Sequence, residues 1–235
     1  MNNIVLIIIL GISSVVNCVA QKKVFEKSVN DEVFTTDEGP NKKTFKHLYI
    51  QYAMFPADYQ GAEIKILKSN SYGVGYRYKY KLASYYSLGF DVSCLIYNFN
   101  LKQNSSKLLP NSVLHKNELL RTNNLSLELY QRLNIGRAGN MLGLYFDVGG
   151  YAGYVFAPKH IYKDKITDNE YHSGISITKH KNLKYFEPFT YGIRTRLGYN
   201  KLGIVAEYRL SDLLKKRFGY PKLPDWSVGI QLSVF

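Results

Sequence analysis

Apolar and polar residues alternate with a period of two along most of the chain, which is the pattern of β-strands with one apolar face and one polar face. Between positions 72 and 82, Tyr, Val and Leu occupy the even positions, whereas Gly, Arg and Lys occupy the odd positions. The pattern recurs often enough to predict eight strands: 48–54, 72–82, 88–96, 125–132, 142–156, 189–197, 202–210 and 226–234.

The segments between these strands are alternately long and short. The long segments are 55–71, 101–118, 157–183 and 211–225, and the short ones lie around Ala83, around Gly136 and at 198–201. Transmembrane up-and-down barrels have this arrangement, with short periplasmic turns and long external loops. We therefore predict an all-β fold, an eight-stranded antiparallel up-and-down transmembrane β-barrel, with both chain ends in the periplasm.

The glycines indicate which side of each strand faces the lumen. Many of them, including Gly73, Gly75 and Gly89, share the parity of the charged residues. Small residues leave room for long ones inside a narrow barrel, whereas they only weaken a strand surface that faces water. We expect the charged residues of this parity to line the lumen. A structural network is the favoured interpretation of these charges, and a transport path is the alternative. Its members are Arg77, Lys79, Asp91, Glu128, Arg132, Asp147, Arg194, Arg196, Glu207 and Arg209.

With Lys81, this predicted lumen set holds seven bases and four acids. The opposite parity carries Leu, Ile, Val, Phe and Tyr, as a hydrocarbon environment requires. The interior of an eight-stranded barrel is nearly filled by side chains, so a wide pore is not expected.

Composition and charge narrow the class of protein. The chain has 31 Lys and Arg against 18 Asp and Glu, a net charge of +13, and 46% hydrophobic residues, so we expect a folded and strongly basic protein. Its only cysteines, Cys18 and Cys94, offer no disulfide framework, and no Cys and His cluster has zinc-site spacing. We predict no metal and no cofactor.

The N-terminus has the features of a secretory signal. An apolar run at 4–12 is followed by small residues before Gln21, which predicts a signal peptide at 1–20. A lipoprotein signal ending at Cys18 is the competing interpretation. We expect a polar periplasmic tail at 21–46 and the barrel at 47–235. Because we expect the protein to be exported, we expect no nucleic-acid partner in spite of the positive charge.

Two of the long segments are rich in cations. We propose that they contact anionic surfaces, such as the phosphates of lipopolysaccharide, because clustered cations near an anionic leaflet gain about 1 kcal/mol each. Ordinary solubility is the alternative. The residues are Lys159, Lys163, Lys165, Lys179, Lys181, Lys184, Lys215, Lys216 and Arg217, with Lys222 nearby.

The five histidines lie mostly in or beside predicted loops: His47, His115, His160, His172 and His180. His172 and Ser173 lie near Glu170, but neighbours in one loop do not define a catalytic triad. A metal pair of His172 and His180 lacks further ligands at suitable spacing. We predict no catalytic residues.

The C-terminal segment 226–235 resembles the closing strand of outer-membrane proteins, which commonly end in an aromatic residue read by the barrel-assembly machinery. With segments 191–199 and 206–210, it is similar to the small outer-membrane β-barrel proteins abundant in Bacteroidota. Phe235 departs from this pattern, because it shares the parity of Ser227 and Gln231 instead of that of Val228.

The resemblance implies residence in the outer membrane of a Gram-negative bacterium, in contact with outer-membrane lipid and lipopolysaccharide. The function we expect is a structural or surface-interaction role through the external loops. The alternatives are an accessory barrel for secretion or envelope assembly, similar to PorT-like components with secretion-system partners, a lipid A-modifying enzyme, and a narrow channel.

Overall fold

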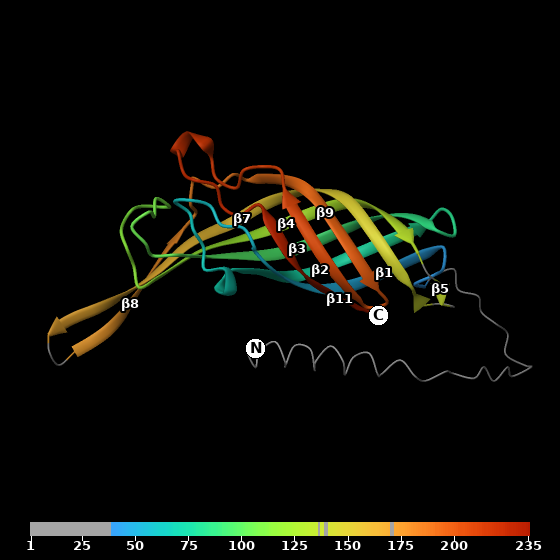
Figure 1. Cartoon of the computed structure of the whole chain (residues 1–235), viewed down its shortest axis with the longest axis horizontal. Helices are drawn as coiled ribbons and strands as arrows, with labels where there is room; N and C mark the ends of the chain where they lie inside the picture. Colours follow the sequence, from blue (N-terminus) through green and yellow to red (C-terminus); the bar gives the residue numbers. More distant parts are fainter. Residues whose placement is uncertain (1–38, 136, 139–140, 170–171) are drawn as a thin grey trace, which may run out of the picture. The chain divides into compact units, whose positions relative to one another are not determined.

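The computed structural model describes residues 39–135, 137–138, 141–169 and 172–235. The predicted signal peptide and most of the predicted tail lie outside the described residues. Most of the described chain is β-strand, and the rest is loop, turn and short 3-10 helix (Figure 1). No helix within these ranges has the length and hydrophobicity of a membrane-spanning segment.

Eight antiparallel strands form a closed ring, which confirms the predicted barrel (Figure 1). Each of the eight pairs with two neighbours, and the pairings β1–β11 and β4–β7 complete the circle. In chain order, the ring strands are β1 (Thr44–Met54), β2 (Asn70–Lys81), β3 (Tyr86–Leu101), β4 (Asn117–Asn134), β7 (Leu144–Asn169), β9 (Phe189–Tyr199), β10 (Leu202–Arg209) and β11 (Trp226–Val234).

Several strands are longer than the sequence pattern predicts. β1 begins at Thr44, so residues 44–46 belong to a strand although we expected them in the polar tail. The small pair β5 (Arg137–Ala138) and β6 (Met141–Leu142) lies in the β4–β7 connection, and two short 3-10 helices, η2 (Ile66–Lys68) and η3 (Lys216–Phe218), lie in the long loops.

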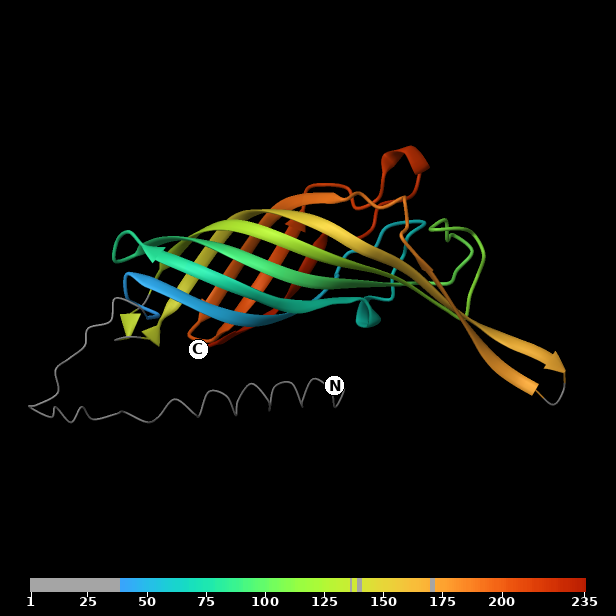
Figure 2. The ribbon, with the colours of Figure 1, turned by 180° about the vertical axis from the view of Figure 1, so that it is seen from behind.

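The longest predicted loop, 157–183, is instead mostly a β-hairpin. β7 continues to Asn169 and pairs with β8 (His172–Lys181), and this hairpin extends past the end of the barrel (Figures 1 and 2). The prediction of a loop was wrong because the lysines conceal a period of two, in which isoleucines such as Ile175 and Ile177 share one face with lysines.

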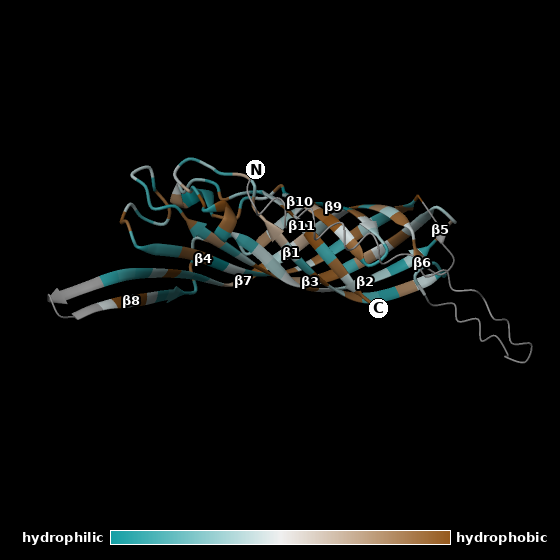
Figure 3. Ribbon diagram, turned by 60° about the horizontal axis from the view of Figure 1, so that its bottom comes forward, coloured by the Kyte–Doolittle hydropathy of each residue, from teal (hydrophilic) through white to brown (hydrophobic). Residues whose placement is uncertain are grey.

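The two faces of the strands have opposite polarity, so brown and teal alternate along each ribbon in Figure 3. Outward side chains are apolar and exposed, such as Leu127 with 52% of its surface accessible, whereas the inward Arg77 is 0% exposed. A Cβ at the inward Gly75 would lie 2.3 Å from the Tyr49 ring. Glycine therefore makes room for a large inward ring, as expected from the parity of the glycines.

A register shift between Arg121 and Asn123 separates the barrel from its external extension. Opposite this shift, Ala157 of β7 has a positive φ of 49°. Val155 is buried before the shift and His160 is buried after it, so the inward parity changes from odd to even. The odd-numbered lysines of the hairpin consequently face outward.

Candidate functional site

The centre of the lumen contains an ion network with equal numbers of positive and negative groups. Eight side chains from six strands take part, and each residue is at most 5% exposed. They are Arg77, Arg132, Arg194, Arg196, Asp91, Glu128, Asp147 and Glu207. Four guanidinium groups thus face four carboxylates, which is the arrangement that a confined interior tolerates.

One half of the network is centred on Asp147. Arg132 donates from Nε to Oδ1 at 2.7 Å and from Nη2 to Oδ2 at 2.9 Å, and Arg77 donates from Nη2 to Oδ2 at 2.8 Å. Arg77 also lies 3.2 Å from Asp91. The guanidinium of Arg132 lies 3.8 Å from the centre of the Tyr145 ring, which adds a cation–π contact.

The other half is centred on Glu128. Arg196 donates to both carboxylate oxygens at 2.6 Å, and Arg194 donates to Oε2 at 2.9 Å. Arg194 also binds Glu207 through Nε at 2.9 Å and Nη2 at 2.7 Å, while Arg196 reaches Gln231 at 2.9 Å. Arg194 and Arg196 therefore each bridge two partners from different strands, and these contacts connect opposite sides of the barrel.

Three of the predicted lumen bases occupy positions outside this network. Lys79 and Lys81 donate to the main-chain oxygens of residues 40 and 41, at 2.5 and 3.1 Å. Arg209 donates to the main-chain oxygen of Pro224 at 2.9 Å. The apparent excess of bases therefore lies near the two ends of the lumen, where carbonyl groups supply the partners.

A hydrophobic cluster fills the mouth of the barrel at the end that carries the long loops. It contains inward residues of β3, β4 and β7 together with residues of the long loops, which fold over the opening. Its buried members are Phe55, Ala62, Ile64, Leu95, Tyr97, Phe99, Leu101, Leu109, Leu120, Val155, Phe186, Leu213, Leu214 and Leu223. The lumen thus has an ionic centre and an apolar cap.

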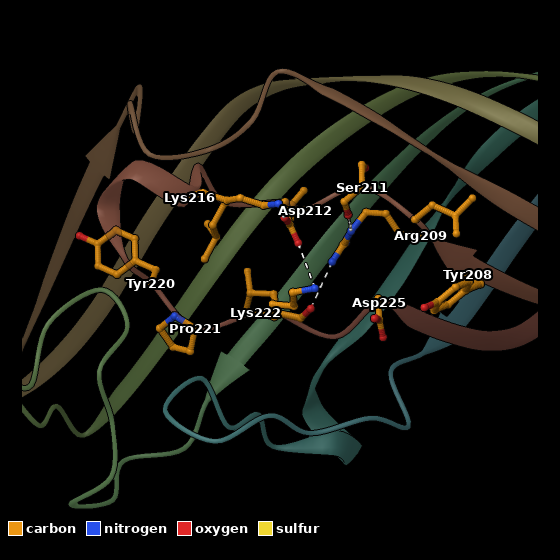
Figure 4. Close-up of a pocket in the computed structure, with 13 residues that line it drawn as sticks. Tyr208, Arg209, Ser211, Asp212, Lys216, Tyr220, Pro221, Lys222 and Asp225 are labelled. Atoms are coloured by element: carbon orange, nitrogen blue, oxygen red, sulfur yellow. Dashed lines mark hydrogen bonds and ion pairs between the residues drawn. The ribbon is translucent and has the colours of Figure 1, made fainter.

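A small cavity of about 150 Å³ lies between the ends of β10 and β11 (Figure 4). Its charged groups already have partners, because Lys216 and Lys222 each lie 3.4 Å from Asp212. On the adjoining loop, Tyr59 donates to Asp225 at 2.7 Å, and this hydrogen bond raises the pKa of Tyr59 to about 12. These pairings give the cavity a structural role.

The predicted cationic residues form two groups. The first group covers the outward face of the hairpin, where three cross-strand pairs join a lysine to an isoleucine and Lys159 lies opposite Lys181. Its lysines are Lys159, Lys163, Lys165, Lys179 and Lys181. This face carries no carboxylate between residues 159–165 and 175–181, so its charge is of one sign.

The second group lies around η3 and comprises Lys215, Lys216 and Arg217. These residues share a surface depression with outward apolar residues that include Phe189, which is 71% exposed. Lys184 belongs to the adjoining loop, where the main-chain N–H of Lys215 donates to the carbonyl of Tyr185 at 2.8 Å. Cations therefore lie directly beside the outward apolar surface.

The histidines do not lie mostly in loops, as the sequence suggested. His47 is in β1, His160 is in β7, and both His172 and His180 are in β8, while His115 is in the β3–β4 loop. The strands extend further than predicted because the cross-strand partners continue beyond the barrel.

Two imidazoles bind carboxylates on the inner side of the hairpin. His160 Nε2 lies 2.6 Å from Glu118 Oε1, and His115 Nδ1 lies 2.9 Å from Asp164 Oδ2. Neither contact involves a nucleophilic side chain. Sequence reasoning missed this cluster, although the even positions of 160–164 carry polar and aromatic residues that alternate with the lysines.

Most side chains of the suggested catalytic and metal groups lie outside the described part of the chain, and His180 contacts the rings of His160 and Tyr162. Glu170 and the side chains of His172 and Ser173 lie outside the described residues. Within the described part of the chain, no three His, Cys, Asp or Glu side chains converge as they would around a metal ion. The described residues therefore give no support to the alternative of a lipid A-modifying enzyme.

Phe235 lies on the inward side of the closing seam. The β1–β11 register is continuous from Leu48 opposite Val234, so no bulge changes the parity. The Phe235 ring makes an edge contact with Phe45 at 5.0 Å and receives Lys201 Nζ over its face at 5.1 Å. The terminal aromatic residue thus packs at the end of the lumen.

No protein-family model matches the chain, and no curated protein matches it. Among solved structures, the chain is similar to Ail, the attachment invasion locus protein of Yersinia pestis, whose crystal structure contains the heparin analogue sucrose octasulfate. The match covers 80% of this chain and 94% of Ail, with 14% sequence identity and a TM-score of 0.33. At this identity and score, the fold assignment rests on the strand pairing, and the function must be argued from this chain's own residues.

Proposed function

We propose that this chain is a bacterial outer-membrane protein whose barrel spans the bilayer. The observation that carries the proposal is the outward face, because every ring strand exposes large apolar side chains there. Examples in ring order are Ile50, Val74, Phe90, Leu127, Val148, Ile193, Ile204 and Ile230. A contiguous apolar surface of this kind is costly in water and favourable in hydrocarbon.

The main-chain hydrogen bonds and the aromatic side chains at the strand ends also fit a position in the bilayer. A closed ring satisfies the main-chain hydrogen bonds of its strands, as a bilayer requires. Aromatic side chains such as Tyr191 and Trp226, which are 57% and 46% exposed, lie at strand ends nearest the long loops. Tyr and Trp favour the boundary between hydrocarbon and headgroups.

The proposed role is a structural and surface-interaction one without catalysis, exerted at the external end. The outward hairpin lysines and the η3 cations would contact anionic groups, above all the phosphates of lipopolysaccharide. Phe189 and Tyr191 beside the η3 cations support this proposal, since such a pairing of apolar and cationic groups suits a lipid headgroup. Assembly would use the barrel-assembly machinery.

Cell fractionation tests the location. We expect the protein in the outer-membrane fraction, resistant to extraction at alkaline pH, with a folded band in detergent gels that changes mobility on boiling. Recovery as a soluble periplasmic protein would contradict the proposal. If deletion stops the release of secreted proteins, the accessory role in secretion would be favoured over surface interaction.

A matched pair of double variants tests the anionic contact. Lys163→Ala with Lys165→Ala removes two outward hairpin charges, whereas Lys42→Ala with Lys43→Ala removes two exposed charges at the opposite end. We expect only the hairpin variant to lose thermal stabilisation by purified lipopolysaccharide in detergent, and the difference to shrink at high salt. Equal losses in both variants would show that net charge alone accounts for the effect.

A further inference from the structure

A groove opens on the inner side of the hairpin base. Three parts of the chain line it: the β3–β4 loop, the paired strands β7 and β8, and the segment that leads from β8 towards β9. Its volume is about 640 Å³, which lies within the range of small-molecule sites. Because the inward residues His160 and Tyr162 contribute to it, the groove lies on the other side of the hairpin from Lys163 and Lys165, and Lys181 at the end of β8 borders both surfaces.

One wall of the groove consists of nearly parallel rings. The ring centres of His115 and Tyr162 are 4.1 Å apart with an interplanar angle of 26°. Tyr162 and His180 are 5.8 Å apart at 26°, and His160 and His180 are 6.0 Å apart at 22°. At 4.1 Å, His115 and Tyr162 cover each other's faces, so the wall offers a ligand the exposed His180 ring and ring edges whose polar atoms suit hydroxyl groups.

Carboxylates behind this wall hold the imidazoles in place. Glu118 is 2% exposed, and it contacts His160 at 2.6 Å while accepting hydrogen bonds from Gln103 and Lys107. Asp164 holds His115 in the same manner. These contacts also fasten the β3–β4 loop to β4 and β7. A wall that is fixed before the ligand arrives loses less entropy on binding.

The polar groups of the groove favour a hydroxylated anion. Lys181 and Lys184 line it, together with the side-chain amides of Asn111 and Asn182, and no carboxylate belongs to the described lining. The Tyr185 hydroxyl is buried and has no hydrogen-bond partner among the described residues. Burial raises the pKa of this hydroxyl, so it stays a neutral donor.

We propose that this groove binds an anionic saccharide, with the exposed His180 ring and the polar ring edges contacting the sugar and the two lysines pairing with carboxylate, phosphate or sulfate groups. The same chemistry is offered by the saccharide of the bacterium's own lipopolysaccharide and by acidic glycans on foreign surfaces. Lysines pair with either source as compact positive charges. This inference goes beyond the contact of the outward lysines with the membrane surface.

Calorimetric titration of the full-length barrel in detergent tests the proposal, with trigalacturonate as the acidic probe and maltotriose as the neutral one. We expect trigalacturonate to bind at least about tenfold more tightly than maltotriose. His180→Ala should weaken the binding of both probes by about tenfold, since it removes an exposed ring without disturbing the core. Lys184→Ala should weaken only the acidic probe.

Lys42→Ala is the charge-matched control, because Lys42 is exposed, lies at the opposite end of the barrel and does not line the groove. Its affinity for both probes should equal that of the wild type. The heat-modifiable band verifies folding of each variant. Lipid-free saccharide from the bacterium's own lipopolysaccharide, titrated beside trigalacturonate, identifies the source that binds more tightly.

Several results would overturn the proposal. They are failure of both saccharides to bind, equal losses in Lys184→Ala and Lys42→Ala, and competition by sodium sulfate at the same concentration as trigalacturonate. Tighter binding of a triglutamate peptide than of trigalacturonate would assign the groove to an acidic peptide instead. Because these measurements use detergent-solubilised protein, they do not depend on membrane location or on lipopolysaccharide contact by the hairpin.

Discussion

Replacement of Glu128 by Gln is the sharpest test of the lumen network. The substitution keeps the size and shape of the side chain and removes one negative charge. Glu128 has a fully buried side chain and accepts three short hydrogen bonds from Arg194 and Arg196. In the variant, four guanidinium groups would face only three carboxylates in an interior closed to bulk water.

The magnitude follows from these contacts. A hydrogen bond to a charged group contributes about 1.5–3 kcal/mol, and a glutamine oxygen can replace only part of the three. The glutamine NH₂ group would also face guanidinium donors. Removal of one partner from a buried ion pair costs about 3–5 kcal/mol, so we expect a loss of that size in the free energy of unfolding.

Urea titration in lipid vesicles, followed by the heat-modifiable band, measures this free energy. Glu63→Gln is the control, because Glu63 has a 25% exposed side chain, lies 3.7 Å from Lys102 and accepts hydrogen bonds from the neutral Asn104 and Ser106, so loss of its charge should cost less than about 1 kcal/mol. Addition of Arg196→Gln to Glu128→Gln restores the charge balance and should recover part of the loss. A cost below about 1 kcal/mol for Glu128→Gln alone would refute the reasoning.

Three further predictions concern the faces of the barrel. In the same titration, Leu127→Lys should lower the free energy of unfolding by about 2–4 kcal/mol, whereas Leu127→Ile should have little effect. Equal stabilities of the two variants would mean that this face does not contact lipid. Cys94 is exposed on the outward face of β3, so in membranes it should react with an uncharged, lipid-soluble maleimide and resist a charged thiol reagent; rapid reaction with both would place it in water. The purified barrel should be electrically silent in planar bilayers, because ion pairs and the apolar cap fill its lumen, and a steady conductance would contradict this.

The strand count and the polarity of the faces could be predicted from the sequence because both are local properties. In an extended chain, residues two apart lie on one face, so Arg77 and Gly75 can be assigned to the same face without knowledge of the neighbouring strands. The exposure of Ile50 and the burial of Arg77 agree with that parity. Alternation of long and short segments likewise reflects connection lengths, which are read along the chain.

Partners within the lumen depend on tertiary structure. Arg77 and Asp147 are 70 positions apart and belong to strands that are not neighbours in the ring, so their 2.8 Å contact depends on the stagger and curvature of the closed barrel. The same geometry places Lys79 and Arg209 at main-chain carbonyls although they share the parity of the paired arginines.

The external end was the least predictable part. Lysines made residues 157–183 look like a loop, and only pairing with β4 and β8 shows the continuation of β7. The register shift at Arg121 then reverses the parity, which turns His160 inward and the hairpin lysines outward. Local pattern determined that each strand has an apolar outward face and a more polar inward face. Long-range register decided which charges meet and where the stacked rings gather, because these positions are set by strands distant in sequence.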